Sequence, residues 1–179
     1  MQRSLYGHAS QSEAGKPGVK TMEIKRIGVV GAGQMGNGIA HVCALAGYDV
    51  VLNDLVQDRL DAALTTIDGN LHRQVARGKI SDAEMTKALS RIKTSISLDA
   101  FGDVDLAIEA ATEDEQVKRK IFAAVCPKLK KEAMLASNTS SISITRLASS
   151  TDRPERFIGL HFMNPVPVMQ LVELIRGIA

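Results

Sequence analysis

The sequence predicts an α/β fold with a doubly wound, mostly parallel sheet, and three observations support this prediction. Short apolar runs alternate with amphipathic helical segments from residue 22 onward. A glycine-rich turn, G-A-G-Q-M-G at residues 31–36, joins the first apolar run to the first helical segment. An acidic residue, Asp54, follows the second apolar run, 23 residues after Gly31.

The first half of the chain alternates two strands with two helices. Residues 27–30 form a short apolar run of the kind found in buried parallel strands. Gly47 is placed to end the following helix in the left-handed conformation, and the apolar stripe of that helix consists of Ile39, Val42, Cys43 and Ala46. Residues 48–53 predict a second strand, and residues 57–76 predict a long helix.

The second half continues the alternation. Ser81 and Glu84 have the spacing of a capping box, which predicts a short helix through Leu89. Pro127 should loosen the last turn of a helix over residues 115–128. The remaining predicted elements are strands over 92–96, 104–110, 134–137, 157–162 and 169–175 and a short helix over 142–149.

Composition limits the class of protein. We expect one domain over residues 22–179, with the polar, Gly/Ser-rich residues 1–21 as a flexible extension. No run of 18 apolar residues is present, a net charge of +2 is small, and Trp is absent, so we expect neither a membrane nor a nucleic-acid partner. Cys43 and Cys126 lack metal-type spacing, which indicates two buried thiols, no metal site and a cytoplasmic location.

Each glycine of the turn has a physical role in binding a dinucleotide. Gly31 permits the tight turn from strand to helix, and Gly33 lets a pyrophosphate approach the backbone. Gly36 lets the helix lie close to the sheet. The pyrophosphate then meets the unpaired N–H groups and the positive end of the helix dipole.

Asp54 stands where a carboxylate can accept hydrogen bonds from the ribose hydroxyls of the cofactor. Its charge favours NAD over NADP, and its neighbours Asn53, Leu55 and Val56 offer no cation for a 2′-phosphate. The alternative is a glycine-rich turn in some other α/β protein, with Asp54 as a helix cap.

A second polar group follows the predicted strand at 134–137. The segment 138–141 (Asn-Thr-Ser-Ser) should face the crevice at the carboxyl ends of the parallel strands. The same residue types are also ordinary helix caps, and position alone does not separate the two interpretations.

His161 and Glu173 lie on the last two predicted strands, 12 residues apart across one loop. A carboxylate on a buried strand needs a partner. If the strands are adjacent, Glu173 can bond one imidazole nitrogen of His161 and leave the other free as a general base. A purely structural His–Glu pair is the alternative.

Three segments together resemble the L-3-hydroxyacyl-CoA dehydrogenases, and the 3-hydroxybutyryl-CoA dehydrogenase branch most of all. They are IGVVGAGQMGNGIA at 27–40, SNTSS at 137–141 and GLHFMNPVPVMQLVE at 159–173. The resemblance runs from about Met22 to the end of the chain. It implies a Rossmann fold, NAD as cofactor and an acyl-CoA substrate.

The resemblance also implies site residues. His161 would be the catalytic base, Glu173 its orienting carboxylate, Ser140 a partner of the substrate's 3-oxygen, and Asn164 a member of the same loop. The implied cofactor contacts are Gly31, Gly33, Gln34, Met35, Gly36, Asp54 and Asn138, with Glu113 and Lys118 near the nicotinamide ribose. From the residues alone, Glu113 and Lys118 look like a solvated helix start.

Three basic residues fall where the family meets the CoA phosphates: Arg73, Arg77 and Lys79. An exposed basic helix end explains them equally well. Family members continue into a helical domain that this chain lacks, so we expect it to bind NAD with activity well below that of a full-length relative. The surface left without that domain should be apolar and promote self-association.

Three functions remain open from the sequence. The first is a dehydrogenase that interconverts 3-hydroxyacyl-CoA and 3-ketoacyl-CoA by hydride transfer. The second is a non-catalytic NAD-binding module of the same family. The third is a relative that acts on another hydroxy acid or a sugar acid.

Overall fold

The computed structural model describes residues 22–178, and the predicted extension at 1–21 lies outside the described residues. The described residues build one seven-stranded sheet with the strand order β3-β2-β1-β4-β5-β6-β7. The strands are β1 Arg26–Val30, β2 Asp49–Asn53, β3 Ile92–Ser95, β4 Leu106–Glu109, β5 Met134–Ser137, β6 Phe157–Phe162 and β7 Val172–Arg176. The helices are α1 Gln34–Leu45, α2 Gln57–Ala76, α3 Asp82–Ser90, α4 Glu115–Val125 and α5 Ile144–Ala148, with 3-10 turns η1 Leu98–Phe101, η2 Cys126–Lys128 and η3 Pro154–Arg156.

All neighbouring strands pair in parallel except β6 and β7, which are antiparallel. The doubly wound, mostly parallel sheet predicted from the sequence is therefore confirmed. The strand order reverses beside β1, between the β1–β2 and β4–β5 halves, and this reversal is the point at which parallel sheets bind their ligands.

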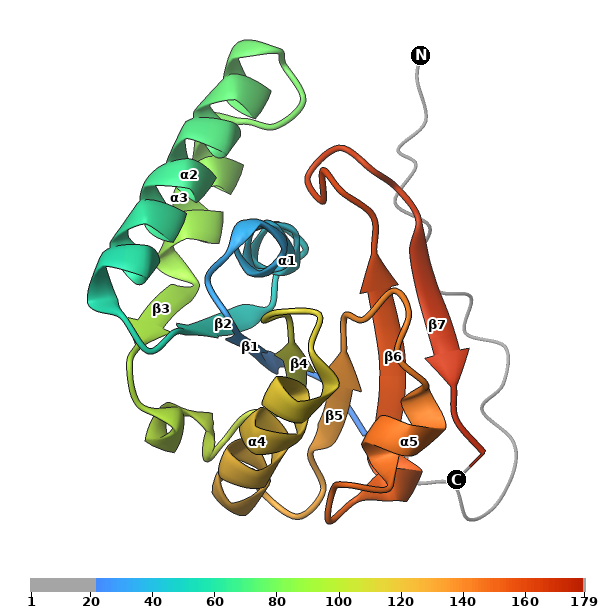
Figure 1. The fold of residues 1–179 in the computed structure, drawn as a ribbon. Coiled ribbons are helices and arrows are strands. Elements are labelled where there is room, and N and C mark those ends of the chain that lie inside the picture. The colour runs from blue at the N-terminus through green and yellow to red at the C-terminus, as the bar shows by residue number, and fades with distance from the viewer. Residues whose placement is uncertain (1–21, 179) are drawn as a thin grey trace.

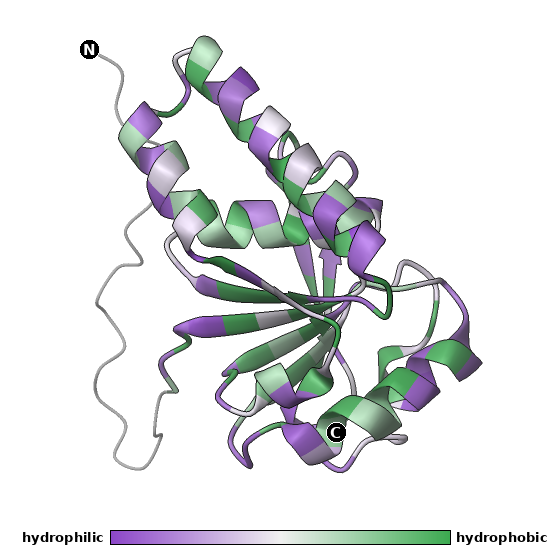
Figure 2. Cartoon of the chain, turned by 90° about the vertical axis from the view of Figure 1, so that its left-hand side faces the viewer, coloured by the Kyte–Doolittle hydropathy of each residue, from purple (hydrophilic) through white to green (hydrophobic). Residues whose placement is uncertain are grey.

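The helices cover both faces of the sheet (Figure 1). One core cluster contains the apolar faces of α1, α2 and α3, including Ile39, Leu60 and Ala88. The other contains residues of α4 and α5, including Phe122 and Leu147. Apolar residues fill the middle of the strands and mark one stripe of the long helix (Figure 2).

Several boundaries differ from the sequence prediction. The 3-10 turn η1 was not predicted, and β4 is shorter than the apolar run at 104–110. Pro127 lies within η2, so the α-helix ends at Val125 as the proline requires. The last strand begins at Val172 rather than at residue 169, since the preceding residues belong to the loop.

The expectation that Glu173 lies on a buried strand is wrong. Every residue of β7 is exposed, because β7 is an edge strand paired only with β6. The apolar residues of this strand are therefore exposed in the described part of the chain: Val172, Leu174 and Ile175. No helix within residues 22–178 is long and apolar enough to cross a membrane.

Candidate functional site

The glycine turn joins β1 to α1 with little spare room. Gly31 has φ +103°, and a Cβ there would lie 2.8 Å from the carbonyl oxygen of Ala110. A Cβ at Gly36 would lie 1.7 Å from the carbonyl oxygen of Gly31, so this glycine is required by the turn itself. A Cβ at Gly33 would meet nothing within 4 Å. Gly33 therefore borders open space at the first turn of α1, where a pyrophosphate fits.

Asp54 ties the end of β2 to this turn. Its Oδ2 accepts the backbone N–H of Ala32 at 2.9 Å, and its Oδ1 accepts that of Val56 at 3.3 Å. Val56, not Asp54, is the N-cap residue of α2, and no side chain caps that helix. The helix-cap interpretation of Asp54 is therefore wrong.

A groove of about 660 Å³ lies over the glycine turn and between α2 and α4. Its apolar walls include Leu55, which is 88% exposed, with Val117 and Ile121. Gly33, Gln34, Met35 and Asp54 also line it. Apolar walls for an adenine, a carboxylate for a ribose and a side-chain-free turn for phosphates together fit a dinucleotide.

A cation also stands beside Asp54. The guanidinium Nη1 of Arg59, in the first turn of α2, lies 3.9 Å from Asp54 Oδ1. From the sequence, only Asn53, Leu55 and Val56 were considered beside this carboxylate, and Arg59, five residues after Asp54, was missed.

A second groove of about 510 Å³ adjoins the first at Gly33 and Gln34. Asn164, in the loop between β6 and β7, lines it together with Asn70 of α2 and Arg59. The proposed CoA-binding residues do not line it. These residues are exposed at the distal end of α2 and just beyond it: Arg73, Arg77 and Lys79.

His161 and Glu173 face one another across the antiparallel pair β6–β7. They are register partners, and His161 Nδ1 lies 2.8 Å from Glu173 Oε2. The His161 side chain is 21% exposed and that of Glu173 is 49% exposed. No hydrogen bond to Nε2 of His161 is found within residues 22–178, so this nitrogen is available to a ligand. The adjacency predicted from the spacing is confirmed.

Glu113 organises the turn that carries Ser140. One carboxylate oxygen accepts hydrogen bonds from the hydroxyls of Thr139, Ser140 and Ser141 and from the N–H groups of Ser140 and Ser141. Burial raises the pKa of Glu113, but these hydrogen bonds and the nearby Lys118 outweigh it and lower the pKa to about 2. Glu113 is therefore charged across the physiological range.

Asn138 connects this turn to the strand that carries the histidine. Its side-chain oxygen accepts the backbone N–H of Phe162 at 2.8 Å. Because Phe162 follows His161 directly, the Ser140 turn and the imidazole are held on neighbouring strand ends.

Lys118 lies beneath the site rather than in it. Its side chain is only 1% exposed, and its ammonium lies 2.8 Å from Glu109 and 3.5 Å from Glu113. The solvated helix start expected from the residues alone is wrong for Lys118. Glu109 and Ser137, whose hydroxyl donates to Glu109 at 2.6 Å, were missed, although a carboxylate ending an apolar strand was an available signal.

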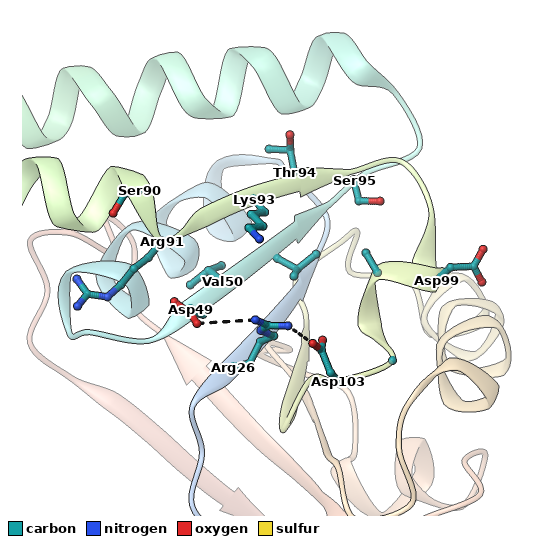
Figure 3. Close-up of a pocket in the computed structure, with 13 residues that line it drawn as sticks. Arg26, Asp49, Val50, Ser90, Arg91, Lys93, Thr94, Ser95, Asp99 and Asp103 are labelled. Atoms are coloured by element: carbon teal, nitrogen blue, oxygen red, sulfur yellow. Dashed lines mark hydrogen bonds and ion pairs between the residues drawn. The ribbon is translucent and has the colours of Figure 1, made fainter.

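A larger hollow, about 830 Å³, lies elsewhere, beside η1 and β3 (Figure 3). Arg26 and Asp49, the first residues of β1 and β2, line it, and Arg26 also pairs with Asp103. It therefore includes the amino ends of the strands, whereas ligands of parallel sheets bind at the carboxyl ends. No group of three or more potential metal ligands is found within residues 22–178.

Comparison with known proteins agrees with this site. Residues 26–179 match the family described as 3-hydroxyacyl-CoA dehydrogenase, NAD binding domain. The chain belongs to this family. As a member of the 3-hydroxyacyl-CoA dehydrogenase NAD-binding family, it takes NAD as its cofactor, in agreement with the groove over Gly33.

Individual relatives of this family member are similar over the same region. A 3-hydroxybutyryl-CoA dehydrogenase of Bradyrhizobium diazoefficiens is 66% identical over 156 residues, which are 87% of this chain and 53% of the relative. The structure of (S)-3-hydroxybutyryl-CoA dehydrogenase from Ralstonia eutropha has a TM-score of 0.85 at 47% identity, covering 87% of this chain and 55% of that one. The chain thus spans about half the length of these relatives.

Proposed function

We propose that this chain carries the catalytic half of an NAD-dependent oxidoreductase that interconverts (S)-3-hydroxyacyl-CoA and 3-ketoacyl-CoA. The observation that carries the proposal is the 2.8 Å contact between His161 Nδ1 and Glu173 Oε2 at the carboxyl end of β6. The names of the relatives support a short acyl chain, such as 3-hydroxybutyryl.

The His–Glu pair supplies the acid–base chemistry. Glu173 accepts the Nδ1–H of His161, which leaves Nε2 as the lone-pair nitrogen that faces the substrate. In the oxidative direction Nε2 removes the proton of the 3-hydroxyl, and Glu173 stabilises the imidazolium that forms. Bound NAD supplies the hydride acceptor.

Ser140 and Asn164 position the reacting group. The backbone N–H of Ser140 donates to Glu113 at 2.9 Å, which fixes the residue, and its exposed hydroxyl can turn from a 3.3 Å contact with Glu113 to donate to the 3-oxygen of the substrate. Asn164 lines the groove that adjoins Gly33, on the side where an acyl-CoA would enter. Lys118 acts through Glu113, because it is buried.

Activity with acetoacetyl-CoA and NADH tests this proposal. Wild-type chain should oxidise NADH, and His161→Ala should lower the rate by about 10²- to 10⁴-fold while leaving the Kd for NADH within about twofold. His72→Ala, an exposed histidine on α2, is the matched control. Equal rates for wild type and His161→Ala would refute the catalytic role.

A non-catalytic NAD-binding module is the competing function. It predicts NADH binding with no turnover and no effect of acetoacetyl-CoA on thermal unfolding, whereas a substrate-binding chain is protected by the thioester when NAD is present. A relative acting on another hydroxy acid would be protected by that acid instead. Because the relatives are about twice as long, we expect slower turnover than theirs from this chain assayed alone.

We also propose that the exposed edge strand β7 and the residues flanking it mediate self-association in the cytoplasm, where the buried Cys43 and Cys126 stay reduced. The exposed apolar residues are Val172, Leu174 and Ile175 on the strand, with Leu171 and Ile178 beside it. Such a patch promotes association. Sedimentation at micromolar concentration should give an oligomer, and Leu174→Lys should restore a monomer; a monomeric wild type contradicts this.

A further inference from the structure

The hollow of about 830 Å³ beside η1 and β3, which we name the η1 hollow, is large enough for a small molecule. It includes the amino ends of β1 and β2, so it lies at the opposite edge of the sheet from the glycine turn at residues 31–36. Val51 of β2 packs with Phe101 of η1 on the sheet face that carries α4 and α5. This short turn, rather than an α-helix, covers β2 on that face, and the η1 hollow lies beside it (Figure 3).

The acidic side chains of the η1 hollow all have cationic partners. Arg26, whose side chain is 35% exposed, pairs with Asp103 and lies 3.9 Å from Asp49. Asp99 pairs with Lys128 of η2. The negative charge of the wall is therefore largely compensated before a ligand enters.

Two cations of the η1 hollow have no such partner. They are Arg91, which ends α3, and Lys93 of β3, and no ion pair or side-chain hydrogen bond of either is found within residues 22–178. Lys93 is the register partner of Val51, so its side chain points to the same face of the sheet. In Figure 3 the side chains of Arg91 and Lys93 extend to the side of β3 on which Arg26 lies, whereas Thr94 points to the other side. Together the two cations can bind a group with a double negative charge, such as a phosphate monoester.

We propose that the η1 hollow is a second ligand site, which binds a small sugar phosphate. The phosphate monoester binds Arg91 and Lys93, and hydroxyl groups of the sugar donate to the carboxylates of Asp99 and Asp103 toward the η1 end. A phosphate ion alone fills only a small part of 830 Å³, so the volume favours an organic phosphate. The site is independent of His161 and of the proposed dehydrogenase reaction, and it can be occupied while NAD is bound at the other edge of the sheet.

Calorimetric titration with glucose 6-phosphate tests the site on the chain saturated with NADH. Wild type should bind one equivalent, and Arg91→Gln and Lys93→Gln should each raise the Kd by at least about tenfold. Lys87→Gln, at an exposed lysine of α3 outside the hollow, should leave the Kd within about twofold of wild type. No binding at about 10 mM glucose 6-phosphate, or a Kd that neither substitution raises, overturns the proposal. Displacement of NADH also overturns it, because the sugar phosphate then occupies the cofactor groove.

Inorganic phosphate separates the two parts of the ligand. It should bind at least about tenfold more weakly than glucose 6-phosphate, and Asp99→Ala should leave its Kd within about twofold. The same Asp99→Ala substitution should weaken glucose 6-phosphate by about fivefold, because a sugar hydroxyl loses its acceptor. Equal affinities for the two probes would mean that the hollow holds only an anion, which contradicts the assignment to a sugar phosphate. Unchanged urea unfolding curves show that the variants are folded.

Discussion

The ammonium of Lys118 lies 2.8 Å from both carboxylate oxygens of Glu109, and both side chains are 1% exposed. The pair connects α4 to the end of β4, and the hydroxyl of Ser137 on β5 completes it. Glu113 lies at 3.5 Å on the side of Lys118 that faces the site. A buried charge network therefore supports the turn that carries Ser140.

Glu109→Gln should destabilise the fold strongly. The substitution leaves a buried ammonium without its principal counter-ion, and breaking a buried pair in this way costs about 3–5 kcal/mol. Urea unfolding at pH 7 measures the loss. Glu132→Gln, the same change at an exposed position, should lie within about 0.5 kcal/mol of wild type. A small effect of Glu109→Gln would mean that water reaches Lys118.

The buried His41 predicts a loss of stability at acid pH. It is fully buried on α1, with Nε2 3.4 Å from Gln74 Oε1 and Nδ1 without a partner in the described part of the chain. Burial lowers the pKa of His41 below 6.5, and the Gln74 contact only partly opposes this. Below pH 6.5 the unfolded chain takes up a proton that the folded chain does not, so the free energy of unfolding decreases as the pH is lowered.

His41→Leu should remove that acid dependence. Between pH 7 and pH 5 the wild-type free energy of unfolding should gain a slope of up to about 1.4 kcal/mol per pH unit from this residue alone. Urea unfolding of both proteins across this range measures the difference. His72→Gln, at an exposed histidine of α2, should retain the wild-type slope, and parallel profiles for wild type and His41→Leu would refute the assignment.

Arg153 predicts a second stability effect, because its buried guanidinium caps three backbone carbonyls. It donates to the oxygens of Cys126, Lys130 and Ala133 and pairs with Asp152. Lysine keeps the charge but cannot reproduce this fork of donors. Arg153→Lys should therefore lower the free energy of unfolding by about 2–4 kcal/mol in urea.

Arg156→Lys provides the comparison for Arg153. Arg156 is half-buried, and in the described part of the chain its side chain makes one hydrogen bond, of 3.2 Å, to the carbonyl of Glu132. Its substitution should change stability by less than about 1 kcal/mol. Equal effects of the two substitutions would show that the carbonyls near Arg153 find other donors.

Sequence periodicity predicted the alternation of strands and helices because each element buries one regular face. The order of the turn, Asp54 and His161 along the chain also placed these residues at strand ends, where the structure has them, and the spacing of His161 and Glu173 predicted that they lie on adjacent strands. What it missed depends on the direction in which side chains point. Arg59 stands five residues after Asp54, in the first turn of α2, and the charge pattern alone does not show that its guanidinium lies 3.9 Å from Asp54 Oδ1.

Burial was the other property that local patterns did not reveal. Lys118 belongs to a charged helix start, yet its ammonium points inward to Glu109, nine residues earlier on β4. Conversely, the apolar run around Glu173 indicated a buried strand, although β7 is an exposed edge. Hydrophobicity shows which residues can be buried, while the position of a strand in the sheet decides whether they are.

Gly33 and Gly36 offer a separation of cofactor binding from folding. Gly33→Ala places its Cβ in space with no atom within 4 Å and at an ordinary φ of −66°, so stability should change by less than about 1 kcal/mol. The methyl group occupies the place of the pyrophosphate, and NADH affinity should fall by at least about tenfold. Gly36→Ala forces a Cβ to within 1.7 Å of the Gly31 carbonyl and should destabilise the fold by about 1–3 kcal/mol or more. Thermal unfolding and NADH titration of both variants test this. If Gly33→Ala binds NADH as the wild type does, the pyrophosphate does not bind at this turn.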